Sequence, residues 1–260
     1  MDVDKDLARR RFSRAARSYN KWSKPQEHMA ERLMSLLPEE KPKSVMEIGC
    51  GTGLLTGHLT GIFLDTLITA IDIAPGMIEQ CKRELAGKSN VKYIVADAEE
   101  LDLPERFDLI VSSSCFQWFS DIERTMRRLA AHLAPKGCLA FAAPVNGTLC
   151  ELQSCYEKAA PGKKSGHALP EPESFLQAII NAGLRVERSE VETRIFTYGR
   201  PEDALESLRG IGATRAVRNG GPGLSRTQIG KMLESYKCDF STEDGQVTCT
   251  YRTIYVRARI

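Results

Sequence analysis

The stretch Val45-Met-Glu-Ile-Gly-Cys-Gly-Thr-Gly53 joins a short apolar run to three glycines spaced by two, and an amphipathic segment follows it. This order is typical of a strand that turns through a glycine loop into a helix. Glycine lets the backbone turn sharply and lets a ligand approach closely, because no Cβ stands in the way. We therefore expect a nucleotide-type cofactor at this loop.

The residues around the loop argue against the two common phosphate-binding motifs. A dinucleotide fingerprint requires its third glycine at position 54, which is Leu54, and the Gly-Lys-Ser/Thr of a phosphate loop is absent. Glu47 adds a negative charge next to the loop and favours a cationic cofactor, such as a sulfonium or ammonium. The alternative for Glu47 is a purely local hydrogen-bonding role.

Short apolar runs alternate with longer amphipathic segments beyond Ser44, which predicts βαβ units and a doubly wound, mostly parallel α/β sheet of the Rossmann-like kind. The predicted strands are 44–48, 67–72, 92–95, 107–112 and 137–143. The predicted helices are 53–63, 75–86 and 121–134, and Pro135-Lys136-Gly137 is expected to end the last of them.

The flanking segments extend this core. Residues 4–36 predict one or two helices, with Phe12, Ala15, Ala16, Tyr19 and Trp22 on one face. A helix at 171–182, ended by Gly183, precedes a strand at 184–197, and a last strand is predicted at 247–259. Between these strands, helices at 201–217 and 225–237, joined by a turn at 219–223, predict a separate helical layer.

We expect a single domain over residues 1–260. It would comprise N-terminal helices at 1–43, an α/β core at 44–199 and 238–260, and a helical lid inserted at 200–237 before the last strand.

Two acidic residues follow predicted strands at the edge where a doubly wound sheet binds its ligands. Asp72 ends the second strand, 19 residues beyond Gly53, where a carboxylate accepts hydrogen bonds from both hydroxyls of a ribose. Asp97 follows the third strand and is placed to accept a hydrogen bond from an adenine amino group next to Ala98. Together with the glycine loop, these residues predict an adenosine-containing cofactor.

Composition excludes several other classes of protein. The chain has 260 residues, 42% apolar and 27% charged, and a net charge of +2, so neither a nucleic-acid binder nor a disordered chain is expected. No apolar run reaches the roughly 18 residues that a membrane span needs. The charge is uneven, with +4 over residues 1–43, −4 over 44–145 and +3 over 200–237.

Cysteine and histidine usage indicates a cytoplasmic protein without a metal. The eight cysteines lie in a chain too large to need a disulfide framework, and the four histidines are dispersed without metal-ligand spacing. Cys150 and Cys155 do not form a zinc motif. The N-terminal arginines are accompanied by Asp2, Asp4 and Asp6, which a transit peptide would lack.

Residues 44–145 resemble the class I S-adenosylmethionine-dependent methyltransferases in the glycine loop and the acidic residues named above. The resemblance implies that Gly49 and Gly51 pass the methionine part of the cofactor, with Glu47 beside them. It implies that Asp72 and Ile73 contact the ribose side and that Asp97 and Ala98 hold the adenine. Ser113 would face the methionine or the transferred methyl group.

A more specific resemblance extends over nearly the whole chain. Phe116-Gln-Trp118, Ser207-Leu-Arg-Gly-Ile-Gly-Ala-Thr214, Leu224-Ser-Arg226 and the Phe12 to Tyr19 helix face are similar to the malonyl-[acyl-carrier protein] O-methyltransferase family of biotin synthesis. That family methylates the free carboxylate of a malonyl thioester. The resemblance implies S-adenosyl-L-methionine as methyl donor and malonyl-acyl-carrier protein, or malonyl-CoA, as substrate.

Three residues are candidates for substrate contact. Tyr19 would bind the cofactor carboxylate or the substrate, Trp118 would wall the methyl site, and Arg209 would pair with the malonyl carboxylate. The respective alternatives are core packing for Tyr19 and Trp118 and a surface role for Arg209. Since carrier proteins are acidic, basic residues would recruit them; the candidates are Arg10, Arg14, Arg17, Arg215 and Arg218.

Two other functions stay open. The same scaffold would serve a methyltransferase of another small carboxylate or of a phenol. A non-catalytic binding module would keep the fold, although retention of Glu47, Asp72 and Asp97 argues against it, and calorimetry with S-adenosylmethionine would decide.

Overall fold

The parallel core predicted from the sequence forms one side of a seven-stranded sheet. The computed structural model describes residues 3–162, 168–212 and 224–260. The strands of the described chain are β1 Ser44–Ile48, β2 Leu67–Asp72, β3 Val91–Val95, β4 Phe107–Ser113, β5 Leu133–Pro144, β6 Arg185–Tyr198 and β7 Val247–Arg259. Their order is β3-β2-β1-β4-β5-β7-β6, and only β7 runs antiparallel to its two neighbours. The prediction of a doubly wound, mostly parallel sheet is therefore confirmed.

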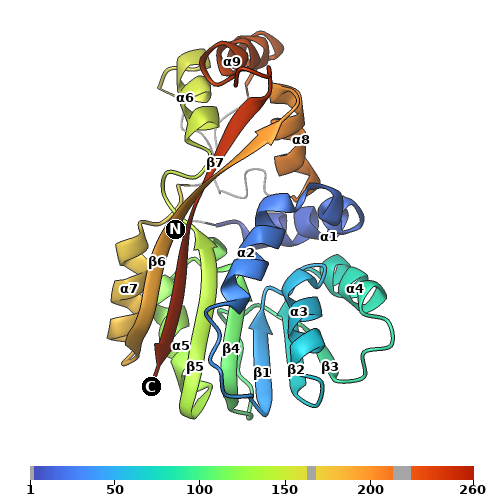
Figure 1. Ribbon diagram of the computed structural model, residues 1–260, viewed down its shortest axis with the longest axis vertical. Helices are drawn as coiled ribbons and strands as arrows, with labels where there is room; N and C mark the ends of the chain where they lie inside the picture. The colour runs from blue at the N-terminus through green and yellow to red at the C-terminus, as the bar shows by residue number, and fades with distance from the viewer. Residues whose placement is uncertain (1–2, 163–167, 213–223) are drawn as a thin grey trace.

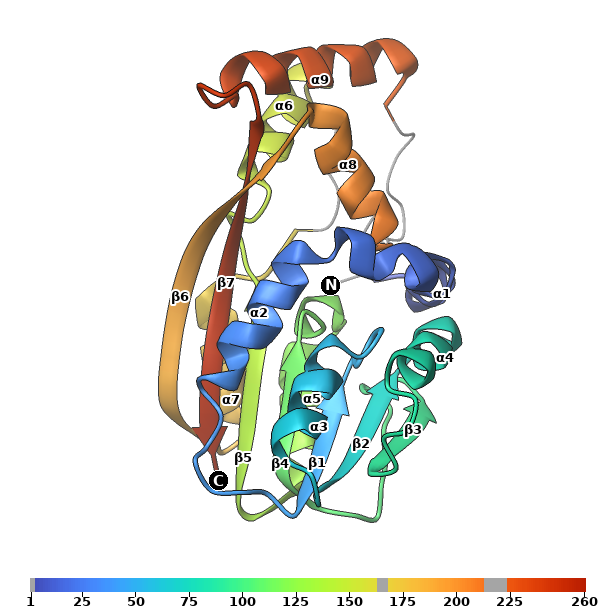
Figure 2. The same cartoon turned by 45° about the vertical axis from the view of Figure 1, so that its right-hand side comes forward.

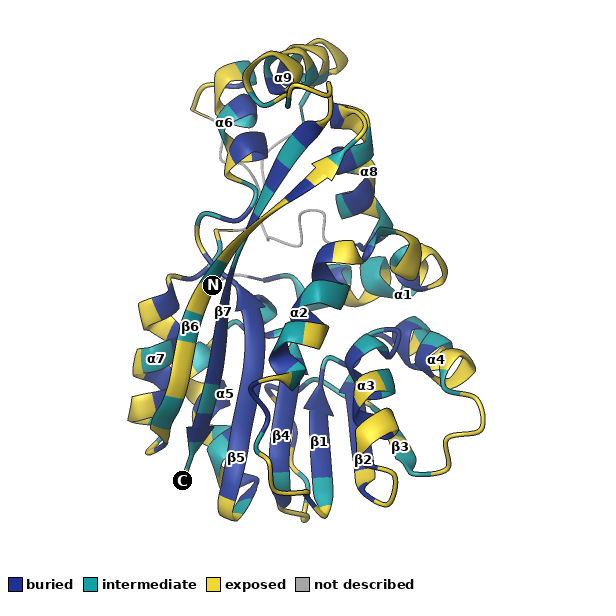
Figure 3. Ribbon diagram, in the orientation of Figure 1, coloured by how far each residue is buried: buried dark blue, intermediate teal, exposed yellow. Residues whose placement is uncertain are grey.

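Helices cover both faces of this sheet (Figures 1 and 2). The described α-helices are α1 Lys5–Trp22, α2 Lys24–Met34, α3 Leu54–Ile62, α4 Pro75–Glu84, α5 Ile122–Ala131, α6 Cys150–Ala159, α7 Pro172–Asn181, α8 Pro201–Gly210 and α9 Arg226–Asp239. Apolar residues of α2 and α3 pack on one face, and those of α5 and α7 pack on the other. Because β1, β4 and β5 are covered on both faces, they are buried along most of their length (Figure 3).

The antiparallel pair β6–β7 projects beyond the rest of the sheet. Strand β5 pairs with β7 only over Thr253–Arg259. Strand β6 pairs with β7 over its whole length, from Val247 to Arg259. Next to the projecting half of this strand pair lie α6, α8 and α9, whose apolar residues form a separate cluster that includes Leu152, Met232 and Tyr236. The predicted helical layer is therefore present, and it includes a helix from outside the predicted insertion.

Some of the expected elements differ from the structure or lie outside its described part. Helix α6 was not predicted. Helix α5 ends at Ala131 instead of 134, because the backbone N–H of Phe107 donates to the carbonyl of His132 and strand pairing starts at Leu133. Pro135-Lys136-Gly137 thus forms an irregular part of β5, where Lys136 has φ +66°. The predicted turn at 219–223 and the end of the helix predicted at 201–217 lie outside the described residues.

Candidate functional site

One cavity collects most of the residues that the sequence predicted to bind a cofactor. It lies between α1 and the carboxyl ends of β1 to β4, and it encloses about 790 Å³ of space including its open mouth. The predicted residues that line it are Tyr19, Gly49, Gly51, Asp72, Ile73, Asp97, Ala98, Ser113 and Trp118.

The glycine loop forms the floor of the cavity because its backbone adopts conformations that other residues rarely take. Gly49, Gly51 and Gly53 have φ angles of +70°, +55° and +96°. A Cβ on Gly49 would lie 2.5 Å from the side chain of Cys115, which lines the same cavity. The loop thus requires glycine both for its backbone conformation and for the approach of the segment after β4.

Asp72 holds the loop in place and faces the cavity. Its Oδ2 accepts the backbone N–H of Gly51 at 3.0 Å, and its Oδ1 accepts that of Ala74 at 2.7 Å. Burial raises the pKa of Asp72 to about 6, although these two hydrogen bonds act in the opposite direction. A carboxylate accepts about four hydrogen bonds, so Asp72 retains the capacity to bind two hydroxyl groups.

Glu47 lies behind the loop and does not line the cavity. Only 1% of the residue is exposed, and its Oε2 has no hydrogen-bond partner. Burial raises the pKa of Glu47 to about 7, and nearby Asp72 contributes to the increase. Its role in cofactor binding stays a prediction, because any effect on a ligand in the cavity would be electrostatic rather than by contact.

Helix α1 forms the roof of the cavity. Phe12 contacts the ring of Trp118 edge to face, with ring centres 5.4 Å apart, and Tyr19 lines the wall nearby. The hydroxyl of Thr52, in the glycine loop, donates to Oδ1 of Asn20 at 2.6 Å, and this hydrogen bond connects α1 to the loop. Burial, together with the charge of Asp72, raises the pKa of Tyr19 well above its usual value, so its phenol stays a neutral donor.

The sequence did not single out Lys5 and Glu99, which also line the cavity. Lys5 forms ion pairs with Asp97 and Glu99, and Glu99 is almost completely buried. No spacing rule connects Lys5 to Asp97, because they are 92 positions apart in the chain. The signal in the sequence is the pair of acidic residues Asp97 and Glu99 directly after the third predicted strand.

Other predicted residues lie away from the cavity. Arg209 is exposed on α8 and is not among the lining residues, so its pairing with a substrate carboxylate stays a prediction. Arg10, Arg14 and Arg17 are exposed on the outer side of α1. Arg215 and Arg218 lie outside the described residues. Within the described chain, no group of three or more His, Cys, Asp and Glu side chains could hold a metal ion.

The side chains that face the cavity fit S-adenosyl-L-methionine. Asp72 and Asp97 provide acceptors for the hydroxyl and amino groups of an adenosine, while Ile73 and Ala98 provide apolar surface. The buried hydroxyl of Ser113 has no hydrogen-bond partner, so it remains available to a polar group of a ligand. Among the charged side chains that line the cavity, carboxylates outnumber cations, and this negative balance suits a cationic cofactor.

Comparisons with known proteins agree with this arrangement. A family model described as a methyltransferase domain matches residues 45–137. The malonyl-[acyl-carrier protein] O-methyltransferase of Acetivibrio thermocellus is 33% identical, covering 99% of this chain and 94% of the relative. That of Anoxybacillus flavithermus is also 33% identical, over 98% and 97% of the two chains.

Solved structures share the fold at low sequence identity. A putative methyltransferase from Bacillus halodurans has a TM-score of 0.65 at 15% identity, covering 88% of this chain and 97% of the other. An N-methyltransferase from Bradyrhizobium japonicum, in complex with S-adenosyl-L-homocysteine, has a TM-score of 0.53 at 16% identity, over 88% and 84%. In the described part of this chain, no helix has the length and apolar character to cross a membrane.

Proposed function

Because the chain belongs to the malonyl-[acyl-carrier protein] O-methyltransferases, we propose that it methylates the free carboxylate of a malonyl thioester held by an acyl-carrier protein. It is an S-adenosyl-L-methionine-dependent methyltransferase. The product would be a methyl ester that masks the carboxylate, as expected for an early step of biotin synthesis.

One observation carries the assignment of the cofactor site. Asp72 and Ser113 end β2 and β4, Asp97 follows the end of β3 by two residues, and all three line the same cavity under α1. We assign Asp72 to the ribose hydroxyls, Asp97 with Ala98 to the adenine, and Ser113 to the methionine end. This order follows the sheet, because β2 and β3 lie on one side of the glycine loop and β4 lies on the other.

The proposed reaction requires little acid–base chemistry from the protein. A malonyl carboxylate is already ionised at neutral pH, so an oxygen lone pair forms the new O–CH₃ bond without loss of a proton. When bound, the cofactor supplies a methyl group on a sulfonium, whose bond to sulfur breaks with both electrons going to sulfur. The phenol of Tyr19 stays neutral and orients a reactant by donating a hydrogen bond.

The main contribution of the protein is alignment of the two reactants in a site with little water. Their opposite charges are neutralised during transfer, so a site of low polarity stabilises the transition state relative to the separated ions. Phe12 and Trp118 contact each other edge to face, and they line the same cavity as Ser113 and buried Phe119. We assign Trp118 to the wall of the methyl-transfer site.

The outer side of α1 supports an acidic carrier protein as the partner. Arg10, Arg14 and Arg17 are exposed, at spacings of four and three residues that place them on one side of the helix. The opposite side of the same helix faces the cavity through Phe12 and Tyr19. A carrier docked on these arginines would therefore lie close to the roof of the site.

A cytoplasmic location is part of the proposal. All eight cysteines are free thiols, which supports a reducing compartment.

The deciding experiment incubates the protein with methyl-labelled S-adenosyl-L-methionine and malonyl-acyl-carrier protein. The expected product is a base-labile methyl ester on the acyl chain, with faster transfer than to malonyl-CoA. Acetyl-acyl-carrier protein, which has no free carboxylate, serves as the control. Labelling of free carboxylic acids or phenols without labelling of the malonyl thioesters would contradict the proposed substrate.

A further inference from the structure

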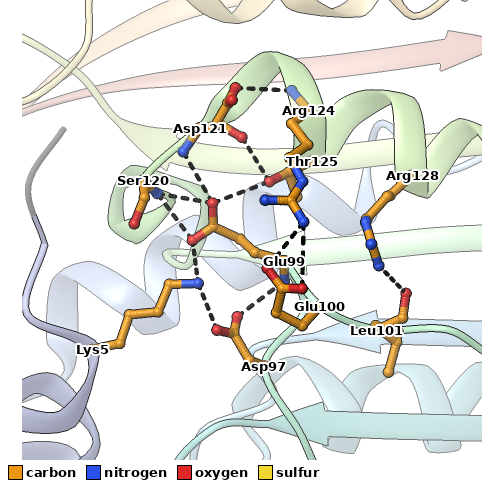
Figure 4. Close-up of polar contacts among 10 residues, drawn as sticks. All are labelled: Lys5, Asp97, Glu99, Glu100, Leu101, Ser120, Asp121, Arg124, Thr125 and Arg128. Carbon is orange, nitrogen blue, oxygen red and sulfur yellow. Dashed lines mark hydrogen bonds and ion pairs between the residues drawn. The ribbon is translucent and has the colours of Figure 1, made fainter.

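Lys5, in the first turn of α1, lies at the end of the cavity that we assign to adenine. Lys5 Nζ lies 2.5 Å from Oδ2 of Asp97 and 2.6 Å from Oε2 of Glu99, and it bridges the two carboxylates (Figure 4). The lysine side chain is 30% exposed, and all three residues line the cavity. The ion pair thus ties the start of the roof helix to the segment after β3.

Glu99 is the fixed partner in this bridge. Its Oε1 accepts the backbone N–H groups of Ser120 and Asp121, both at 3.0 Å, and the hydroxyl of Thr125 lies 3.3 Å away (Figure 4). Burial alone would raise the pKa of Glu99, yet hydrogen bonds from Lys5, Ser120 and Asp121 hold it below its usual value. Glu99 therefore remains charged and anchors the ammonium of Lys5 to the start of α5.

Asp97 is the second carboxylate that Lys5 contacts. Its Oδ1 accepts the backbone N–H of Glu99 at 3.0 Å, and its Oδ2 faces Lys5. Without the ammonium, two carboxylates that share one cation would repel each other, and the more exposed Asp97 would turn away. With it, two acceptor positions of Asp97 are occupied and the remaining ones stay available to a donor in the cavity.

We propose that Lys5 is a positioning residue for cofactor binding, which holds Asp97 in the orientation that accepts the adenine amino group and ties α1 over that end of the cavity. The inference rests on the proposed assignment of Asp97 to adenine. Lys5 acts through Asp97, so its contribution depends on the amino group of the ligand. A general role in stabilising α1 would not show this dependence.

The test is calorimetric titration with S-adenosyl-L-homocysteine and with S-inosyl-L-homocysteine, in which a carbonyl oxygen replaces the amino group. We expect Lys5→Met to raise the Kd of the adenine ligand about tenfold, as loss of a hydrogen bond to a charged group does, and that of the inosine ligand less than about twofold. Lys5→Arg, which keeps the cation, should restore most of the affinity for the adenine ligand.

The matched control is Arg9→Met, which removes an exposed cation from the same helix, one whose ion pair is with Asp6. It should change neither Kd. An equal loss of affinity for both ligands in Lys5→Met would overturn the proposal, and so would tighter binding of the adenine ligand, which would mean that Lys5 competes with the amino group.

Asp97→Asn separates this inference from the proposed site. If that variant loses the preference for the adenine ligand and Lys5→Met keeps it, the positioning role is wrong while the site assignment stands. If the wild-type protein does not distinguish the two ligands, both are wrong. Circular dichroism at the titration temperature verifies that each variant is folded.

Discussion

Gly210 of α8 lies directly against the indole of Trp22 of α1, where a Cβ on the glycine would lie 2.1 Å from Cδ1 of the ring. The hydroxyl of Ser18 also donates to the carbonyl of Gly210, at 3.3 Å. A Cβ on Gly212 would come 3.2 Å from the backbone of Arg11. The glycines of the Leu-Arg-Gly-Ile-Gly-Ala-Thr string thus allow the inserted helix to dock on the roof of the cofactor site.

This docking predicts the effect of enlarging Gly210. Gly210→Ala should separate α8 from α1 and lower kcat/KM for the carrier substrate at least about tenfold, because a misplacement of about 1 Å is costly for aligned reactants. Adding Trp22→Leu, which removes the colliding ring, should restore part of the loss. Gly230→Ala is the control, since a Cβ there meets nothing within 4 Å and alanine favours the helix. Equal activity of wild type and Gly210→Ala would contradict the coupling.

A second prediction concerns Asp72, which hydrogen-bonds two backbone N–H groups and also faces the cavity. Asp72→Asn should weaken binding of S-adenosyl-L-homocysteine at least about tenfold, because the amide keeps only one acceptor oxygen, which cannot serve both the backbone N–H groups and the ribose hydroxyls. Asp108 supplies a matched control, since its Oδ2 accepts the backbone N–H groups of Lys43 and Ser44. Asp108→Asn should lower Tm without changing the Kd. A loss confined to Tm in both variants would refute the assignment.

A third prediction uses the buried carboxyl of Glu47. Its pKa rises from the ordinary 4.5 to about 7, so between these pH values the folded protein keeps a proton that the unfolded chain has released. The free energy of unfolding should therefore fall as the pH rises through this window, by at most about 3 kcal/mol from this group.

Denaturant unfolding at pH 5 and pH 8 measures this effect. The decrease in stability between the two values should be smaller in Glu47→Gln than in the wild type. Exposed Glu243 provides the control, because Glu243→Gln should leave the decrease unchanged. If Glu47→Gln loses as much stability with rising pH as the wild type does, the carboxyl of Glu47 is ionised throughout.

A fourth prediction concerns the exposed arginines of α1. Reversing the charge of Arg10, Arg14 and Arg17 to Glu should raise KM for malonyl-acyl-carrier protein at low salt, by about tenfold or more, and leave KM for malonyl-CoA nearly unchanged. The difference should shrink at high salt as the charges are screened. Reversal of exposed Lys43, Lys88 and Lys136, at the amino edge of the sheet, is the control. An equal rise in KM for both substrates would exclude docking of the carrier on this helix.

Local sequence patterns predicted the core because its strands and helices have local causes. Strand β1 and the glycine loop are encoded in ten consecutive residues, Ser44 to Gly53, and the predicted bounds of β1 and β2 match those observed. Helix α6, which starts at Cys150, lacks the usual start signal, because its N-cap Leu149 has a left-handed backbone and a side chain that makes no capping hydrogen bond. Its apolar spacing at Leu152, Cys155, Tyr156 and Ala159 is the available signal, and these residues belong to the apolar cluster that α6 forms with α8, α9 and β7.

The sequence by itself determined the order of strands and helices, the glycine loop and the acidic residues at the strand ends, since hydrophobic periodicity and glycine conformation act over a few neighbouring residues. Only the tertiary structure decided which distant side chains meet. It brought Lys5 to Asp97 and Glu99, placed Gly210 on Trp22, and left Arg209 exposed outside the cavity. These contacts depend on how α1 and α8 pack across the edge of the sheet, and no spacing along the chain encodes that packing.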